Sequence, residues 1–203
     1  MCYSFLEQDF KSNEISFRAN IKPVSMQNKN ENKLRFKKEL LRITSNSSFI
    51  ITNTCWVAID YYCKLIDRFK NPGVYDIDNI VKPILDSIVG KDGVLVDDVI
   101  VDRVIVNWID KVGEDHIEIS LSYPDLLYVN KSDLVLFKSK SGWCWPCHRS
   151  IGQGAKSLIK EYFRLWESIQ TNENYCDIIG CLPIQRFIYY SKIKDRDYSF
   201  IEL

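Results

Sequence analysis

The most informative segment of the chain is DIDNIVKPILDSIVGKDGVLVDDVIVDRV, residues 76–104. Apolar residues between 79 and 89 recur at helical spacing, which predicts a helix, with Pro83 near its first turn and Gly90 as its stop. The Lys-Asp-Gly that follows predicts a turn, and the β-branched run 99–108 predicts a strand. A helix and a strand in close succession indicate a protein that mixes both kinds of element.

The flanking segments extend this unit into one α/β (α+β) domain, which we place at residues 14–124. Strands are predicted at 14–20, 50–63, 99–108 and 117–123, and a short basic helix at 33–43. The alternation in 50–63 favours a strand covered on both faces, whereas 117–123 has one wet face. Residues 125–203 form a separate extension, with strands predicted at 133–137 and 184–190 and a helix at 156–169.

The composition excludes several classes of protein. The chain has 203 residues, 46% of them hydrophobic, and its 27 Lys and Arg balance 27 Asp and Glu. These values exclude disorder, collagen and coiled coil, and the length suffices to bury a core without disulfides. No run approaches the roughly 18–20 apolar residues of a membrane helix. We therefore expect a cytoplasmic protein with no membrane partner.

The neutral total conceals a segregation of charge. Residues 11–42 carry nine Lys and Arg against three Glu, whereas residues 76–116 carry ten acidic against four basic side chains. A basic arm beside an acidic centre suits a protein that attracts phosphates and holds a cation, although solvated faces of ordinary elements explain it equally. Five basic side chains near a polar loop are candidates for contacts with a nucleic-acid backbone: Lys29, Lys33, Arg35, Lys37 and Lys38.

Carboxylates within residues 76–104 are candidates for a metal site. Asp76 and Asp78 are two residues apart in an extended stretch and share one side, and Lys82 follows one helical turn after Asp78. A hairpin-like return of the chain could bring Asp97 or Asp98 beside them. Carboxylates that converge persist when a cation neutralises them, and hard oxygen ligands select Mg²⁺ or Mn²⁺.

Magnesium held by carboxylates is a common arrangement for phosphoryl transfer. In such a site Lys82 could supply positive charge to the transition state or help to protonate the leaving group. The same residues also fit a purely structural interpretation. In that alternative Asp78 caps the helix, Lys82 pairs with Asp86, and residues 97–98 form a polar turn.

Eight residues of this stretch stand at fixed offsets: D-x-D-N, a lysine four residues after the second Asp, an Asp in the same helix, then Asp-Asp and a valine three residues on. They are Asp76, Asp78, Asn79, Lys82, Asp86, Asp97, Asp98 and Val101. This pattern resembles the RusA family of Holliday junction resolvases over residues 14–124. The resemblance implies a small mixed sheet with two helices on one side, and a homodimer that nicks branched DNA symmetrically with Mg²⁺.

Carried over residue by residue, the resemblance implies metal-binding catalytic carboxylates at Asp76, Asp78 and Asp98. It implies a catalytic lysine at Lys82, and Asp97 as a neighbouring metal ligand. The expected function is therefore a Mg²⁺- or Mn²⁺-dependent endonuclease that resolves four-way junctions in recombination and repair. A DNA-binding or assembly module without cleavage, whose cysteine-bearing extension docks a partner, is the alternative.

The extension contains the string Trp-Cys-Trp-Pro-Cys-His, residues 143–148, which has three interpretations. Cys144 and Cys147 could form a structural zinc site with Cys176 and Cys181, with His148 as an alternative ligand. The same string also looks like the thioredoxin active site, which would make the extension a redox domain. Free cysteines without a special role are the third interpretation.

Overall fold

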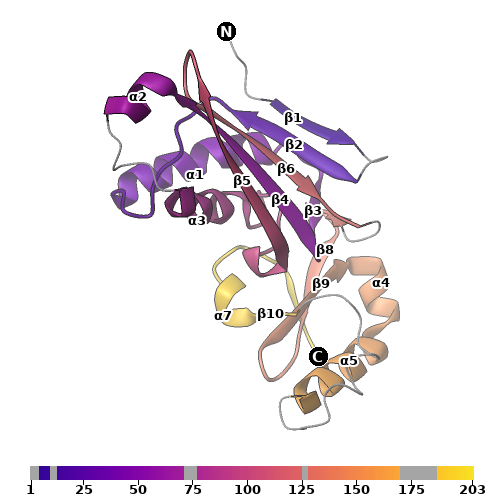
Figure 1. The fold of residues 1–203 in the computed structure, drawn as a ribbon. Coiled ribbons are helices and arrows are strands. Elements are labelled where there is room, and N and C mark those ends of the chain that lie inside the picture. The colour runs from indigo at the N-terminus through magenta and orange to yellow at the C-terminus, as the bar shows by residue number, and fades with distance from the viewer. Residues whose placement is uncertain (1–4, 10–12, 71–76, 125–127, 170–186) are drawn as a thin grey trace.

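The computed structural model describes residues 5–9, 13–70, 77–124, 128–169 and 187–203, and it has the expected mixed α+β fold. The strands form two main sheets, and helices cover one face of the larger sheet (Figure 1). A small third sheet pairs β3 (Phe49–Ile51) with β7 (Tyr128–Asn130). Among the described helices, none is long and apolar enough to cross a membrane.

The larger sheet is mixed and has the order β1-β2-β6-β4-β5. Its strands are β1 (Phe5–Asp9), β2 (Glu14–Ala19), β4 (Cys55–Lys64), β5 (Val101–Lys111) and β6 (His116–Ser122). The β4–β5 pair is parallel, and the remaining pairs are antiparallel. Along β4, Val57, Ile59 and Tyr61 are buried, whereas Trp56 on the other face is 53% exposed.

This alternation corrects the expectation that residues 50–63 form one strand covered on both faces. The segment divides into β3 and β4, and in the described part of the chain one face of β4 carries no helix. The open face tolerates water because it carries charged and aromatic side chains. Asn107 of β5 donates to Asp60 at 2.7 Å, and Arg103 lies 5.4 Å from the centre of the Trp56 ring.

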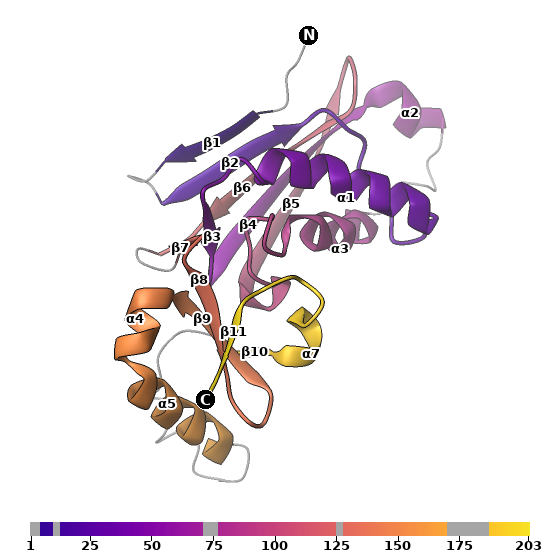
Figure 2. The ribbon, with the colours of Figure 1, turned by 180° about the vertical axis from the view of Figure 1, so that it is seen from behind.

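Two helices cover the other face of the larger sheet, as Figure 2 shows. They are α1 (Asn30–Thr44) and α3 (Ile77–Ile88). Phe36 and Leu40 of α1 and Ile84 and Ile88 of α3 are buried in one apolar cluster with the inward side chains of the strands. Two helices on one side are thus confirmed. A short helix, α2 (Leu65–Lys70), follows β4.

Helix α3 begins at Ile77, two residues earlier than expected, so that Pro83 lies in its interior. Proline has no N–H for the carbonyl four residues before it. The Asn79 carbonyl instead accepts from the N–H of Met26 at 2.9 Å, which fastens the β2–α1 loop to α3. Beyond the helix, Gly90 has φ +106°, and this left-handed conformation explains why glycine stands there.

The chain then returns through residues 94–96, which bond to β3: Ile51 donates to Val94, and Val96 donates to Ile51. A 3₁₀ turn, η1 (Asp98–Ile100), precedes β5, so the strand expected from residue 99 begins at Val101. Both aspartates of the acidic pair are therefore placed by a turn and not by a strand.

The extension folds around a second sheet of order β10-β9-β8-β11. Its elements are β8 (Leu134–Lys138), β9 (Trp143–His148), α4 (Arg149–Gly154), α5 (Lys156–Ile169), β10 (Ile188–Tyr189), α7 (Tyr190–Ile193) and β11 (Phe200–Glu202). Leu136, Cys144 and Ile188 belong to the same apolar cluster as the larger sheet, so the core is continuous across the expected boundary at residue 124. The other face of this sheet packs against α5.

Candidate functional site

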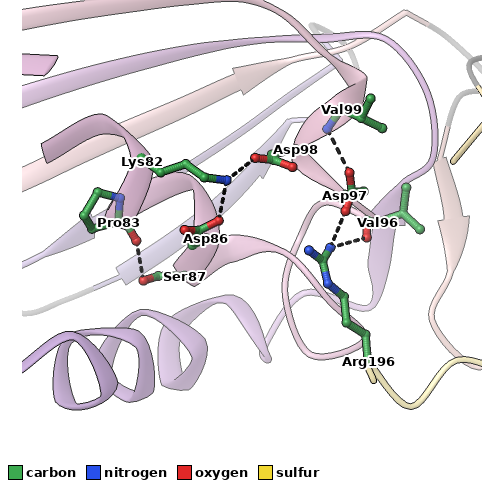
Figure 3. A network of polar contacts seen from close by, with 9 residues as sticks. All are labelled: Lys82, Pro83, Asp86, Ser87, Val96, Asp97, Asp98, Val99 and Arg196. Atoms are coloured by element: carbon green, nitrogen blue, oxygen red, sulfur yellow. Dashed lines mark hydrogen bonds and ion pairs between the residues drawn. The ribbon is translucent and has the colours of Figure 1, made fainter. Parts of the chain in front are cut away.

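Lys82, Asp86 and Asp98 form an ion cluster between α3 and the turn before β5 (Figure 3). The Lys82 Nζ atom donates to Asp86 Oδ1 at 2.7 Å and to Asp98 Oδ2 at 2.5 Å. Lys82 and Asp86 are one helical turn apart, whereas Asp98 is 16 residues from Lys82 in the sequence. The chain therefore returns to α3, where Asp98 meets Lys82, whereas the expected approach of Asp98 to Asp76 and Asp78 stays a prediction.

Asp97 lies next to Asp98 but has a different environment. Its side chain is 0% exposed, and its Oδ1 atom accepts from the Val99 N–H at 3.0 Å, which caps η1. Its Oδ2 atom lies 2.7 Å from the Arg196 guanidinium. Because both oxygens are engaged inside the protein, this geometry argues against the expected role of Asp97 as a metal ligand. Sequence reasoning missed Arg196, since no local pattern connects residues about 100 positions apart.

The remaining candidate carboxylates are only partly described. Asp78 is exposed in the first turn of α3, one turn before Lys82, where a carboxylate also interacts favourably with the helix dipole. Asp76 lies outside the described residues. Within the described ranges, no group of three His, Cys, Asp or Glu is arranged to hold a metal ion. The expected ligand set of Asp76, Asp78 and Asp98 thus stays a prediction.

Electrostatics distinguish the two adjacent aspartates. Burial raises the pKa of Asp98, but the hydrogen bond and charge of Lys82 outweigh it and hold that pKa below its usual range. Burial likewise raises the pKa of Asp97, and here it prevails over the Val99 N–H and Arg196. Burial lowers the pKa of Lys82, yet its bonds to Asp86 and Asp98 raise it overall. Lys82 is therefore a cation at neutral pH.

The chemistry of this cluster fits a hard divalent cation. Its acceptors are carboxylate oxygens, which Mg²⁺ and Mn²⁺ prefer. The Lys82 ammonium already lies between the carboxylates of Asp86 and Asp98, which shows that this position favours positive charge. Asp98 keeps one oxygen that is not bonded to Lys82, and its side chain is 22% exposed. Asp98 is therefore within reach of solvent ions.

The five basic candidates are distributed around α1. Lys33 and Lys37, one turn apart, line a groove of about 360 Å³ between α1 and α3 that Asp86 also lines. Arg35 instead lines a larger cavity of about 590 Å³ beside the β2–α1 loop. Lys29, just before α1, and Lys38 are exposed. Of the five candidates, Lys33 and Lys37 therefore line a groove with Asp86, one member of the ion cluster.

The cysteines of β9 lie in two different apolar environments. Residues three apart in a strand point to opposite faces. Cys144 is buried in the main core, whereas Cys147 packs against the cluster beneath α5. Burial raises the pKa of Cys144 to about 12 and that of Cys147 to about 11, so both thiols stay protonated. This arrangement argues against one zinc ion shared by both; Cys176 and Cys181 lie outside the described residues.

The same geometry disagrees with a thioredoxin-like redox site. A reactive Cys-x-x-Cys thiol has a lowered pKa, commonly at a helix N-terminus. Here both cysteines lie within β9, and burial raises both pKa values. His148 ends the strand, and its Nδ1 atom accepts from the Ser150 N–H at 3.2 Å to cap α4. The ring of His148 thus has a structural role beside α4.

No protein-family model matches this chain, and a comparison with curated proteins finds no match. The function is therefore inferred from the residues of the chain and their geometry.

Proposed function

We propose that this chain is a Mg²⁺- or Mn²⁺-dependent endonuclease that cleaves phosphodiester bonds in branched DNA and resolves four-way junctions as a homodimer. The contact between Lys82 and Asp98 carries the proposal. These residues are far apart in the sequence, yet Nζ and Oδ2 are 2.5 Å apart, as a shared site requires. Their offsets are those that resemble the RusA family.

In this proposal the aspartates and Lys82 have different chemical roles. Asp98, with Asp78 and Asp76, would supply carboxylate oxygens to hold the cation, which when bound would polarise the phosphoryl oxygen and lower the pKa of a water molecule. Lys82 remains protonated because of its acidic neighbours. Its ammonium can stabilise negative charge on the phosphoryl oxygens or donate a proton to the leaving oxygen. Asp86 holds the ammonium from the side of α3.

The groove between α1 and α3 offers a path for the DNA backbone toward this cluster. Lys33 and Lys37 line the groove together with Asp86, the partner of Lys82. Lysine side chains bind phosphates without regard to base sequence, so they would position a strand and not select it. The homodimer would place two such sites on one junction, which paired nicking requires.

Cleavage of a synthetic four-way junction tests the proposal. The wild type should nick the junction when Mg²⁺ or Mn²⁺ is added. Asp98→Asn should lower the cleavage rate by at least about 100-fold, because a bound metal ion lowers the activation barrier by several kcal/mol. Asp92→Asn is the matched control, because Asp92 is an exposed carboxylate of the same segment that is outside the cluster. An intact junction with the wild type, or equal rates for Asp98→Asn, would contradict the proposal.

One observation favours the second candidate, a DNA-binding module without cleavage. Lys82 and Arg196 already neutralise Asp98 and Asp97, so the acidic pair is balanced without a metal ion. A gel-shift titration separates the candidates. Tight binding of the junction without nicking, unchanged by Asp98→Asn, would support the module, and light scattering of the free protein would test the homodimer.

A further inference from the structure

The end of the extension returns to the acidic turn. After α7, Arg196 donates to the Val96 carbonyl at 3.2 Å, and the Tyr198 hydroxyl donates to the same carbonyl at 2.9 Å. Arg196 also pairs with Asp97 at 2.7 Å (Figure 3). Three contacts from two residues of the extension therefore meet at the two positions immediately before Asp98.

Asp97 needs such a partner because of where it lies. Its side chain is 0% exposed, whereas that of Arg196 is 24% exposed. An isolated buried carboxylate is costly, and removal of its cationic partner leaves the charge uncompensated. Arg196 supplies such a partner to one oxygen of Asp97, while the other oxygen accepts from the Val99 N–H.

This bond caps the turn that carries Asp98. Asp97 caps η1 through Val99, and Asp98 is the first residue of that turn. Arg196 holds the Asp97 side chain inside the protein, whereas the Asp98 side chain reaches Lys82. Loss of the cap would free the turn and release Asp98 from a fixed position.

We infer that Arg196 is a positioning residue that acts through Asp97 to hold Asp98 in the cation site, so that the C-terminal extension is part of the site. This inference depends on the proposed endonuclease function. Residues that do not touch the metal but orient one of its ligands typically contribute about 10- to 100-fold to metal affinity or activity. We expect a loss of that size in Arg196→Ala.

The experiment compares Arg196→Ala, Arg196→Lys and Tyr198→Phe in the full chain. Arg196→Lys keeps a positive charge, and Tyr198→Phe is the matched control because it removes the other bond to Val96 while it leaves the Asp97 pair intact. Three quantities are measured: junction cleavage, Mn²⁺ affinity by calorimetry, and hydrogen exchange of the Val99 amide. Exchange of the Ile59 amide in β4 reports global unfolding and separates it from local opening.

Arg196→Ala should weaken Mn²⁺ binding and cleavage by about 10- to 100-fold and speed exchange at Val99 more than at Ile59. Arg196→Lys should recover part of each loss, and Tyr198→Phe should match the wild type. If the wild type binds Mn²⁺ and cleaves but Arg196→Ala equals it, or if Tyr198→Phe loses as much, the positioning role is wrong while the proposed function stands. If the wild type neither binds Mn²⁺ nor cleaves, the proposed function fails and the positioning role with it.

Discussion

Replacement of Lys82 by methionine tests the ion cluster most directly. The change keeps the length of the side chain but removes the ammonium that lies 2.7 Å from Asp86 and 2.5 Å from Asp98. Two carboxylates then face the same space without a cation. We expect the variant to be less stable than the wild type in the absence of divalent ions, and to recover when Mn²⁺ takes the place of the ammonium.

The size of the effect follows from exposure. The pair with Asp86 has both side chains 48% exposed, and such surface pairs contribute about 0.2–1 kcal/mol. The pair with Asp98, whose side chain is only 22% exposed, is a charge-assisted bond of about 1 kcal/mol after discounting for the exposed lysine. Together the two ion pairs contribute about 1–2 kcal/mol to the free energy of unfolding, and their loss should lower Tm by about 2–8 °C for a chain of this size.

The pH dependence has a definite sign. Lys82 holds the pKa of Asp98 below its usual range, so the stabilisation is fully present above the unfolded-state pKa, about 3.9. It is lost as the pH falls through the folded-state pKa of Asp98. The Tm difference between wild type and Lys82→Met should therefore be largest near neutral pH and shrink toward zero in acid.

Thermal unfolding followed by circular dichroism measures these changes, with and without Mn²⁺. Lys91→Met is the matched control, because Lys91 is exposed in the turn after α3. Its free energy of unfolding should stay within about 0.5 kcal/mol of the wild-type value. A Lys82→Met variant as stable as this control at neutral pH, with no greater response to Mn²⁺ than the wild type, would show that the Lys82 ammonium does not stabilise the cluster.

Three further predictions concern other parts of the chain. Cys144 and Cys147 should react slowly with iodoacetamide at about pH 8 in the folded protein, because burial raises their pKa values to about 12 and about 11; mass spectrometry after labelling measures this, and rapid modification of both without denaturant would contradict it. Burial lowers the pKa of Lys131 to about 8, below the unfolded value of about 10.4, so stability should rise by about 1–3 kcal/mol as the pH increases between those values. Urea unfolding should show this rise in the wild type but not in Lys131→Met, and parallel curves would exclude it. The double variant Lys33→Ala, Lys37→Ala should bind junction DNA more weakly and reduce the slope of log affinity against log salt by about 1–2, measured by fluorescence anisotropy; an unchanged slope would remove the groove from the DNA path.

Much of the fold could be predicted from local patterns. The helix expected at 156–169 coincides with α5, and the strand expected at 14–20 with β2 to within one residue. Apolar spacing and helix stops depend on neighbours within a few positions, and these are visible in the sequence. The sequence did not reveal whether the second face of β4 is covered by other elements, because its alternating Trp, Asp and Tyr side chains fit both a packed and a solvent-exposed face.

The candidate site divides in the same way. The pairing of Lys82 with Asp86 follows from helical spacing alone, and the sequence also determined that acidic residues would concentrate near α3. Tertiary packing, in contrast, brings Asp98 to Lys82 and Asp97 to Arg196. It also places Cys144 and Cys147 in separate apolar clusters. The physical reason is the distance along the sequence over which each interaction acts. Helical spacing acts across one turn, whereas a pair about 100 residues apart depends on how the whole core packs.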